Sequence, residues 1–262
     1  SAMATPTDEE LLRRCWDFEL AIGEAIAERV EDVGEGFTAV LDTRIPQVWD
    51  ANYLVVESPA VTAQAVAAKA DEVMGDLGME HRGMGARDPA LGARLTEGLV
   101  KLGWEAEVDV YQVLRRDPDR PADVEVEQVS VEDAYPVNRA AMLAEDWGTP
   151  EVVEQMRKRD GRIAQACHDR WFAAGHEGEP ASVCRLMQRD GIGQVEDVAT
   201  LEPARGQGLA RAVVLAAAQA SVADGDELTF ISALADDWPR RLYERLGFDA
   251  VGEVTTARRK PQ

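Results

Sequence analysis

Apolar and polar residues alternate along this chain with two different periods, so helices and strands are expected to follow one another. Residues 8–30 repeat their apolar side chains at helical spacing. The runs FTAVLDT (37–43) and ANYLVVES (51–58) have the β-branched and aromatic composition of strands. Further along, the pattern predicts helices over 61–77 and 89–102, a short strand over 79–84 and an alternating strand over 105–114.

The pattern then begins again after residues 115–123, RRDPDRPAD, which are charged, hold two prolines and lack apolar anchors. This stretch is expected to be a linker between two domains, 1–116 and 117–262. In the second domain the pattern predicts strands near 124–129, 168–176, 181–189, 194–201 and 227–233, helices near 131–145, 150–165, 209–223 and 238–246, and a last strand. Such alternation predicts an α/β (α+β) fold with a partly parallel, mixed twisted sheet flanked by helices.

One turn in the second half has the composition of an anion site. The segment Glu202-Pro-Ala-Arg-Gly-Gln-Gly-Leu-Ala210 follows an apolar strand and opens a helix rich in alanine and leucine. Glycine lets the backbone approach an anion closely, and a helix N-terminus presents free N–H groups with partial positive charge. Together they suit a diphosphate, to which Arg205 and Arg211 can add charge.

Other phosphate motifs fit this turn poorly. The P-loop pattern is absent, and the third glycine place of the dinucleotide pattern holds Arg211. On the residues alone, an ordinary capped turn before a buried helix remains an open alternative.

Two separated motifs resemble the GCN5-related N-acetyltransferase (GNAT) superfamily. Arg205-x-x-Gly208-x-Ala210 resembles its Q/R-x-x-G-x-G/A signature, and Trp238-Pro-Arg-Arg-Leu-Tyr-Glu-Arg-Leu-Gly-Phe248 resembles its L-Y-x-x-x-G-F element. Their order and spacing leave room for one helix, one strand and one short helix between them. The resemblance covers roughly residues 123–262.

This resemblance implies acetyl-CoA as co-substrate and no metal. It implies that Tyr243 is the general acid for the departing thiolate. It implies pyrophosphate contacts from the signature loop, at Arg205, Gly206, Gln207, Gly208, Leu209 and Ala210. It also implies pantetheine contacts from Val198, Ala199 and Thr200 at the end of the preceding strand. Asp236 stands where many members carry a coenzyme-contacting Asn, so a contact from Asp236 is expected, although the chain departs from the pattern there and Pro239 replaces its Ala.

The expected chemistry needs a base as well as an acid. A free primary amine has a pKa near ~10.4 and must lose a proton before it attacks a thioester. Glu196, on the strand before the turn, is the candidate base; strand alternation predicts that Asp197 points to the opposite face. Two plainer interpretations stay open: Glu196 as a solvent-facing carboxylate and Tyr243 as a half-buried helix tyrosine.

The sequence thus predicts an acetyl-CoA-dependent N-acetyltransferase that acts on a primary amine by direct transfer. A non-catalytic acyl-CoA-binding regulatory module is the alternative from a different class. Use of another acyl donor, or of an alcohol acceptor, is a further alternative.

The first half resembles a degenerate copy of the second. Leu102-Gly103-Trp104 matches Leu246-Gly247-Phe248 at an offset of 144 (246 − 102), and the same offset pairs Pro59 with Pro203. The functional residues do not survive this pairing: Val61, Thr62, Gln64 and Leu99 stand in the places of Arg205, Gly206, Gly208 and Tyr243. The first half is therefore expected to be a GNAT-like domain with a structural role.

Composition narrows the classes of function that remain for this chain. The net charge of −21 and a pI near 4.5 disfavour nucleic-acid binding. No apolar run approaches the ~20 residues of a membrane span. Three scattered cysteines without a C-x-x-C pair favour a reducing cytoplasmic setting, and the histidines do not suggest a metal site. We expect a monomer or homodimer, and a solvated tail or active-site lid at the basic residues 255–262.

Overall fold

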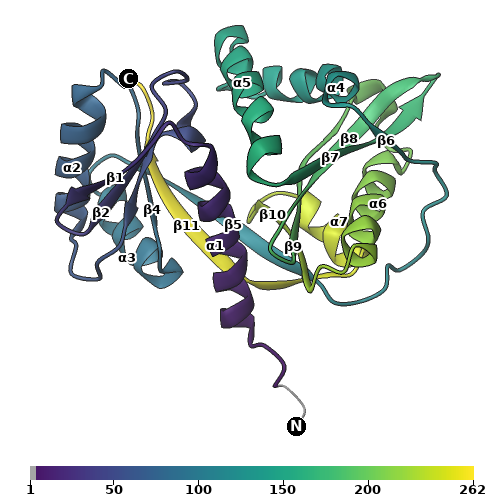
Figure 1. Ribbon diagram of the computed structural model, residues 1–262, viewed down its shortest axis with the longest axis horizontal. Coiled ribbons are helices and arrows are strands. Elements are labelled where there is room, and N and C mark those ends of the chain that lie inside the picture. The colour runs from purple at the N-terminus through teal and green to yellow at the C-terminus, as the bar shows by residue number, and fades with distance from the viewer. Residues whose placement is uncertain (1–3) are drawn as a thin grey trace. The chain divides into compact units, whose positions relative to one another are not determined.

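The computed structural model describes residues 4–262, which form two compact units (Figure 1). The first unit holds the residues up to Val110 together with Gln155–Arg162 and Gly252–Gln262. The second holds Tyr111–Glu154 and Ile163–Val251. Each unit is therefore assembled from separate stretches of chain, which a single linear boundary does not describe. The division at residue 116 stays a prediction.

The first unit is a mixed sheet with helices. Its elements are α1 (Asp8–Ile26), β1 (Arg29–Gly34), β2 (Phe37–Leu41), a 3-10 turn (Trp49–Ala51), β3 (Tyr53–Val56), α2 (Ala63–Asp76), β4 (Arg82–Ala86), α3 (Pro89–Val100), the start of β5 (Glu105–Leu114) and the end of β11 (Phe248–Arg259). Neighbouring strands β1, β2 and β3 are antiparallel, β3 and β4 are parallel, and β11 pairs with β4 antiparallel.

The core of the first unit lies between its sheet and helices α2 and α3. Phe37 and Leu54 come from the strands, and Val66, Met74 and Leu99 come from the two helices. These helices present apolar residues at helical spacing, which is why the sequence predicts them to within a few residues.

The second unit is a longer mixed sheet. Its elements are β6 (Glu127–Val129), α4 (Val131–Leu143), parts of α5 (Pro150–Ala166), β7 (His168–His176), β8 (Glu179–Arg189), β9 (Ile192–Thr200), a 3-10 turn (Glu202–Ala204), α6 (Leu209–Ala223), β10 (Leu228–Leu234) and α7 (Pro239–Arg245), with the end of β5 and the start of β11. The strand order is β5-β10-β9-β8-β7-β6, in which only β9 and β10 of the pairs described are parallel.

The two faces of this sheet are covered by different helices. On one face Phe172, Cys184 and Val195 pack against α6 and α7. On the other face Trp171 and Val183 pack against α4. Strand side chains alternate between the faces, so neighbouring positions such as Trp171 and Phe172 enter different cores.

The basic residues at the end of the sequence correct one expectation. Residues 255–259 are part of β11, where Ala257 is opposite Met84 of β4, so they are no solvated tail. Acidic partners in the first unit take up the basic charge: Arg258 contacts Asp50 at 3.1 Å, and Arg259 contacts Asp71 at 3.1 Å. This pairing is long-range, and a local sequence pattern does not report it.

The expected linker, residues 115–123, is part of the second unit rather than a free connection. The N–H groups of Arg115 and Arg116 donate to the carbonyl of Gly247, at 2.9 and 3.2 Å. The guanidinium of Arg116 binds Asp249, with a shortest contact of 2.7 Å. The charged residues of 115–123 suggest a solvated linker in the sequence. In the structure, Arg115 and Arg116 anchor this stretch to the segment around Gly247.

Candidate active site

Two parallel strands of the second unit separate part-way along their length. β9 and β10 pair from Ile192 and Leu228 as far as Val195 and Ile231. β9 continues to Thr200 and β10 to Leu234 without further pairing to each other. The edge of β9 that faces β10 therefore carries backbone groups open to a ligand from Glu196 onward. We call this opening the strand fork.

A β-bulge lies where the fork begins. Between β8 and β9 the register runs from Val183 opposite Ala199 to Arg185 opposite Glu196, so β9 has one extra residue there. Asp197 takes up this residue with a left-handed φ of 53°. A bulge sets two residues against one and bends its strand.

The bulge corrects the expectation that Asp197 points away from the face of Glu196. Asp197 contacts Arg185, the cross-strand partner of Glu196, with 3.2 Å between Oδ2 and Nη1. Simple alternation holds only in regular strands, and the extra residue breaks it here.

Glu196 lies on the face of the sheet that α4 covers. It is half-buried, and its Oε2 accepts a hydrogen bond from Gln194 Nε2 at 2.8 Å. Its cross-strand partner Arg185 stacks on Trp171 of the same face. The carboxylate is thus held beside the start of the fork.

The glycine turn follows directly from the fork. Gly206 and Gly208 have φ values of 78° and 75°, and a Cβ on either would meet no atom within 4 Å. The left-handed backbone, rather than crowding, therefore requires glycine at both positions. Gly208 is the N-cap of α6 and supplies no side-chain acceptor to the helix.

The turn presents a row of free backbone donors. The Arg205 amide donates to Glu202 at 3.2 Å, and helical bonding in α6 starts at Ala212, which donates to Gly208. Within residues 4–262 the N–H groups of residues 206–211 have no hydrogen-bond partner. Such a row at a helix N-terminus is suited to binding an anion.

The two arginines of the turn differ in availability. Arg205 is exposed, and its Nε donates to the Thr200 carbonyl at 3.3 Å. Arg211 is buried and bound to Asp119 at 2.7 Å and to the carbonyl of Arg120. The expectation that Arg211 adds charge for an anion is therefore wrong, because Asp119 of the same unit already neutralises it.

Tyr243 reaches the same region from α7. Its ring is buried among Cys184, Val195 and other residues of the α6 face, and meets Phe248 edge-on at 6.5 Å. Burial raises the pKa of the Tyr243 phenol well above its ordinary value, and the nearby Cys184 and Glu196 raise that pKa further. The phenol thus stays protonated and able to donate.

The start of α7 has no side-chain cap. Neither Asp236 nor Asp237 caps the helix; its N-cap is Trp238, which has no side-chain cap bond. Asp237 instead accepts from the Trp238 amide at 2.8 Å, and Asp236 is exposed in the loop after β10. A role of Asp236 in cofactor binding remains a prediction.

Sequence reasoning missed Arg185 and its partner Asp169. Arg185 is 1% exposed and binds Asp169 through two contacts, of 3.0 Å and 2.6 Å. A signal was present in the sequence, since an arginine inside the apolar run ASVCRLM of β8 must be paired to be buried.

Residues 137–248 match the model of the family described as "Acetyltransferase (GNAT) family". They contain the strand fork, the glycine turn and Tyr243. Residues 137–248 form a GNAT domain. No curated protein matches the chain in sequence.

Solved structures of similar fold extend over both units. A functionally unknown conserved protein from Staphylococcus epidermidis ATCC 12228 has a TM-score of 0.67 at 15% identity, covering 89% of this chain and 94% of that one. A GCN5-related N-acetyltransferase from Kribbella flavida has a TM-score of 0.59 at 18% identity, covering 92% and 93%. A tandem GNAT protein from the clavulanic acid biosynthesis pathway has a TM-score of 0.54 at 15% identity, covering 80% and 74%. At these identities the likeness shows the fold alone, and in its fold the first half is GNAT-like too.

In its described residues, the first unit lacks both features of this candidate site. β3 and β4 stay paired to the last residue of β3, Val56, whose carbonyl also accepts from the Arg87 amide at 3.0 Å. The N-terminus of α2 is capped by Thr62, whose hydroxyl accepts from Ala65 at 3.2 Å. Leu99, in the place of Tyr243, is fully buried in the core. The strand fork and the open helix N-terminus are thus features of the second unit, and the corresponding elements of the first unit do not have them.

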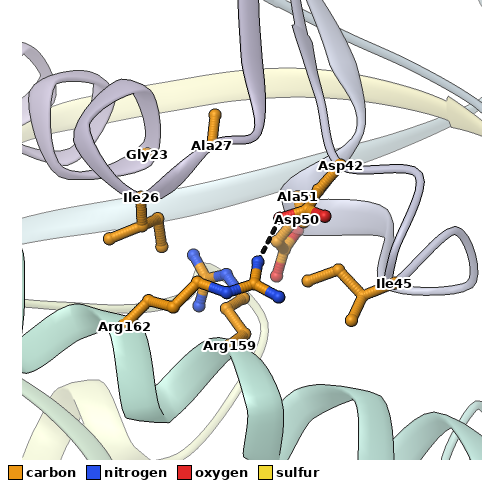
Figure 2. A pocket seen from close by; sticks show the side chains of 9 residues that line it. All are labelled: Gly23, Ile26, Ala27, Asp42, Ile45, Asp50, Ala51, Arg159 and Arg162. Carbon is orange, nitrogen blue, oxygen red and sulfur yellow. Dashed lines mark hydrogen bonds and ion pairs between the residues drawn. The ribbon is translucent and has the colours of Figure 1, made fainter.

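The first unit holds a small cavity of about 10 Å³, room for about one water (Figure 2). Arg159 and Arg162 of α5 extend toward Asp42 and Asp50, and Arg162 forms an ion pair with Asp42. The cavity is too small for a cofactor. Among residues 4–262, no cluster of His, Cys, Asp or Glu has the arrangement of a metal site, and no helix is long and apolar enough to cross a membrane.

Proposed function

We propose that the protein is an acetyl-CoA-dependent N-acetyltransferase that transfers the acetyl group directly to a primary amine. The observation that carries the proposal is the continuity of the strand fork with the open amides of residues 206–211. An extended arm along the β9 edge would lead a terminal diphosphate to those donors. Val198, Ala199 and Thr200 are the proposed contacts of the arm, and Arg205 to Ala210 are those of the pyrophosphate.

The reacting groups flank the fork from the two faces of the sheet. Glu196 lies on the α4 face and Tyr243 on the α6 face. In the proposed reaction Glu196 accepts a proton from the ammonium acceptor, directly or through a water. The amine nitrogen then bonds to the thioester carbon while backbone N–H groups at the end of β9 polarise the carbonyl.

Breaking the carbon–sulfur bond leaves a thiolate, which takes the proton of Tyr243. The adduct nitrogen then gives up its second proton to solvent as the amide forms, and a solvent proton returns Tyr243 to its phenol form. The raised pKa of Tyr243 supports this role, because the phenol keeps its proton throughout the neutral range. A free coenzyme thiol has an ordinary pKa near ~8.5, so protonation or a hydrogen bond makes it a better leaving group.

The setting proposed for this reaction is the cytoplasm. All three cysteines, Cys15, Cys167 and Cys184, are free thiols, which supports a reducing compartment. The acidic chain, with its net charge of −21, is compatible with a cationic acceptor. The oligomeric state proposed is a monomer or homodimer.

The test is release of free coenzyme thiol from acetyl-CoA in the presence of acceptors. The panel should contain small amines, amino acids, aminoglycosides and peptide N-termini, with matched alcohols and longer acyl-CoA donors beside them. Turnover that depends on an amine supports the proposal. Tight coenzyme A binding without turnover on any acceptor would instead identify a non-catalytic acyl-CoA-binding module.

A further inference from the structure

Arg185 is the largest side chain that the second unit buries completely, with 1% exposure. It lies in the middle of β8, on the face covered by α4, where Trp171 and Val183 form the apolar core. A guanidinium in such a place is costly unless its charge is paired and its donors are satisfied. Its partners therefore indicate what the buried charge holds in place.

Those partners come from the two strands on either side. Asp169 of β7 receives two bonds, from Nε at 3.0 Å and from Nη2 at 2.6 Å. Asp197 of β9 receives one from Nη1, at 3.2 Å. The guanidinium also stacks on Trp171, with its Cζ 4.7 Å from the ring centre. We call Asp169, Arg185 and Asp197 the arginine cluster.

The two carboxylates have different surroundings. Asp169 is 5% exposed at its side chain and anchors Arg185 from the core, whereas Asp197 is 36% exposed. Arg185 thus connects a fixed, buried carboxylate to the residue that forms the bulge. A guanidinium that is hydrogen-bonded along one edge and stacked on an aromatic ring has little rotational freedom. It therefore holds Asp197 in one position.

Asp197 needs such a contact because its backbone is unfavourable. A left-handed φ costs a residue with a Cβ about 1 kcal/mol or more, although aspartate tolerates it better than most. Without the contact to Arg185, the extra residue of β9 could form a bulge at another position along the strand. Its present place fixes where the β9 edge turns from β10, and which face Glu196 occupies.

We infer that Arg185 is a positioning residue, which holds the bulge at Asp197 and thereby orients Glu196 and the Val198 edge of the strand fork. This inference rests on the proposed acetyltransferase function. A purely structural ion pair would stabilise the sheet without affecting the reaction. Loss of a positioning residue lowers kcat while the affinity for coenzyme A stays constant. Loss of a purely structural ion pair leaves kcat unchanged.

The decisive variant is Asp197→Gly, because glycine keeps the left-handed φ and loses the contact with Arg185. Asp190→Gly is its matched control: Asp190 also has a left-handed φ, of 52°, and lies in the turn between the same two strands. Its side chain is 89% exposed. Asp197→Asn tests rescue, since Asn retains an oxygen acceptor and tolerates this backbone. Arg185→Lys tests the two-bond geometry.

For Asp197→Gly we expect kcat to fall roughly tenfold to a hundredfold, the effect of a small misplacement of reacting groups. The Kd for coenzyme A should stay within about twofold, because the residue 206–211 amides are untouched. Asp197→Asn should retain more kcat than Asp197→Gly, and Asp190→Gly should match the wild type. An Asp197→Gly kcat equal to that of Asp190→Gly would overturn the inference.

Hydrogen exchange gives a readout that does not need turnover. Loss of the arginine cluster should speed amide exchange in a peptide covering residues 196–200, whereas Asp190→Gly should leave that peptide unchanged. If the wild type binds coenzyme A but acetylates nothing, the proposed function fails while exchange still tests the bulge. Unchanged exchange at 196–200 in Asp197→Gly would refute the positioning role in either case.

Discussion

Tyr243 illustrates how surroundings, rather than residue type, indicate a role. Its ring is 5% exposed, and both burial and the nearby Glu196 raise the pKa of its phenol. Within residues 4–262 its hydroxyl is engaged by no hydrogen bond, so it can donate to a ligand. The role of general acid stays a prediction, and the variant below tests it against the plainer interpretation of a tyrosine that only packs in the core.

Tyr243→Phe should lower kcat by roughly a hundredfold, the usual contribution of a general acid, because it removes only the donated proton. Coenzyme A affinity, measured by calorimetry, should stay within about twofold. Tyr135→Phe, on α4, is the control and should behave as the wild type. A Tyr243→Phe enzyme with full kcat would rule out the acid role.

Glu196→Gln should also lower kcat by roughly a hundredfold at pH 7, since the acceptor amine then keeps its proton. The defect should shrink toward pH 10, where a growing share of an amine with a pKa near ~10.4 is already neutral. The measurement is the pH profile of kcat for the variant and for Glu179→Gln, an exposed control on β8. A defect of the same size at all pH values would contradict the role of base.

Asp109 predicts how stability depends on pH. Burial, and after it the neighbouring carboxylates of Glu107, Glu19 and Asp50, raise the pKa of its carboxyl to about 7 against the opposing charge of Arg258. Because this pKa is higher in the folded than in the unfolded chain, the folded protein binds more protons between about pH 4 and 7. The free energy of unfolding therefore falls as the pH rises through that window.

Asp109→Asn should remove this loss and increase the free energy of unfolding at pH 8 by about 1–3 kcal/mol relative to the wild type. Urea unfolding at pH 5 and pH 8 measures it, with Asp117→Asn as an exposed control. The wild type and Asp109→Asn should differ much less at pH 5. If the free energies of unfolding of the wild type and Asp109→Asn differed by the same amount at pH 5 and at pH 8, the carboxyl of Asp109 would not titrate in this window.

At the scale of elements, the N-terminus of α6 depends on two left-handed glycines. Gly208→Ala should force a Cβ into this backbone at a cost of about 1–2 kcal/mol and shift the amides from their present row. We expect weaker coenzyme A binding, by about tenfold, measured by calorimetry. Gly225→Ala is the control: Gly225 follows the other end of α6 with φ 87° and open space around it.

Both glycine variants should lose similar thermal stability, since both strain one residue of similar conformation. Only Gly208→Ala should lose coenzyme A affinity. If the two variants bind coenzyme A equally well, the row of amides is not the pyrophosphate site.

The sequence predicts an element correctly where the pattern that causes it lies within the residues of that element. The helix expected over 61–77 is α2, Ala63–Asp76, because its periodicity is contained within the helix. β1, Arg29–Gly34, was partly assigned to the preceding helix, since its mostly polar residues become a strand by pairing with β2. The β-branched and apolar runs at 37–43 and 51–58 showed β2 and β3 directly.

The site was predictable in its motifs and not in its geometry. The glycines and Tyr243 could be found from spacing, whereas the bulge at Asp197 arises from a register shift against β8. The alternation rule therefore placed Asp197 on the wrong face. Arg185 was missed because its role depends on partners in two other strands.

At the scale of the whole molecule, each unit includes part of a strand that begins or ends in the other unit. The first unit includes Gly252–Arg259 of β11, and the second includes Tyr111–Leu114 of β5, where Tyr111 stacks on Phe230 at 6.0 Å. Neither half cut at residue 116 therefore contains all of its own sheet.

Expressed alone, residues 117–262 should be unfolded or aggregated, because β5 would be missing and the edge of β10 that it covers would be left unpaired. The full chain cut once within residues 117–123, at an inserted protease site, keeps every strand and should retain coenzyme A binding. Circular dichroism and calorimetry compare the two. A well-folded, coenzyme-binding 117–262 fragment would show that β5 is dispensable.

The pairing of β11 with β4 also sets an order of events during synthesis. β4 leaves the ribosome early, but Gly252–Arg259 is made only after the entire second unit. The first unit must therefore wait, with the β4 edge unpaired, until translation has almost reached the end of this sequence. Such an edge is an aggregation hazard in a nascent chain. Slow translation should harm this protein more than one in which the first domain closes on itself.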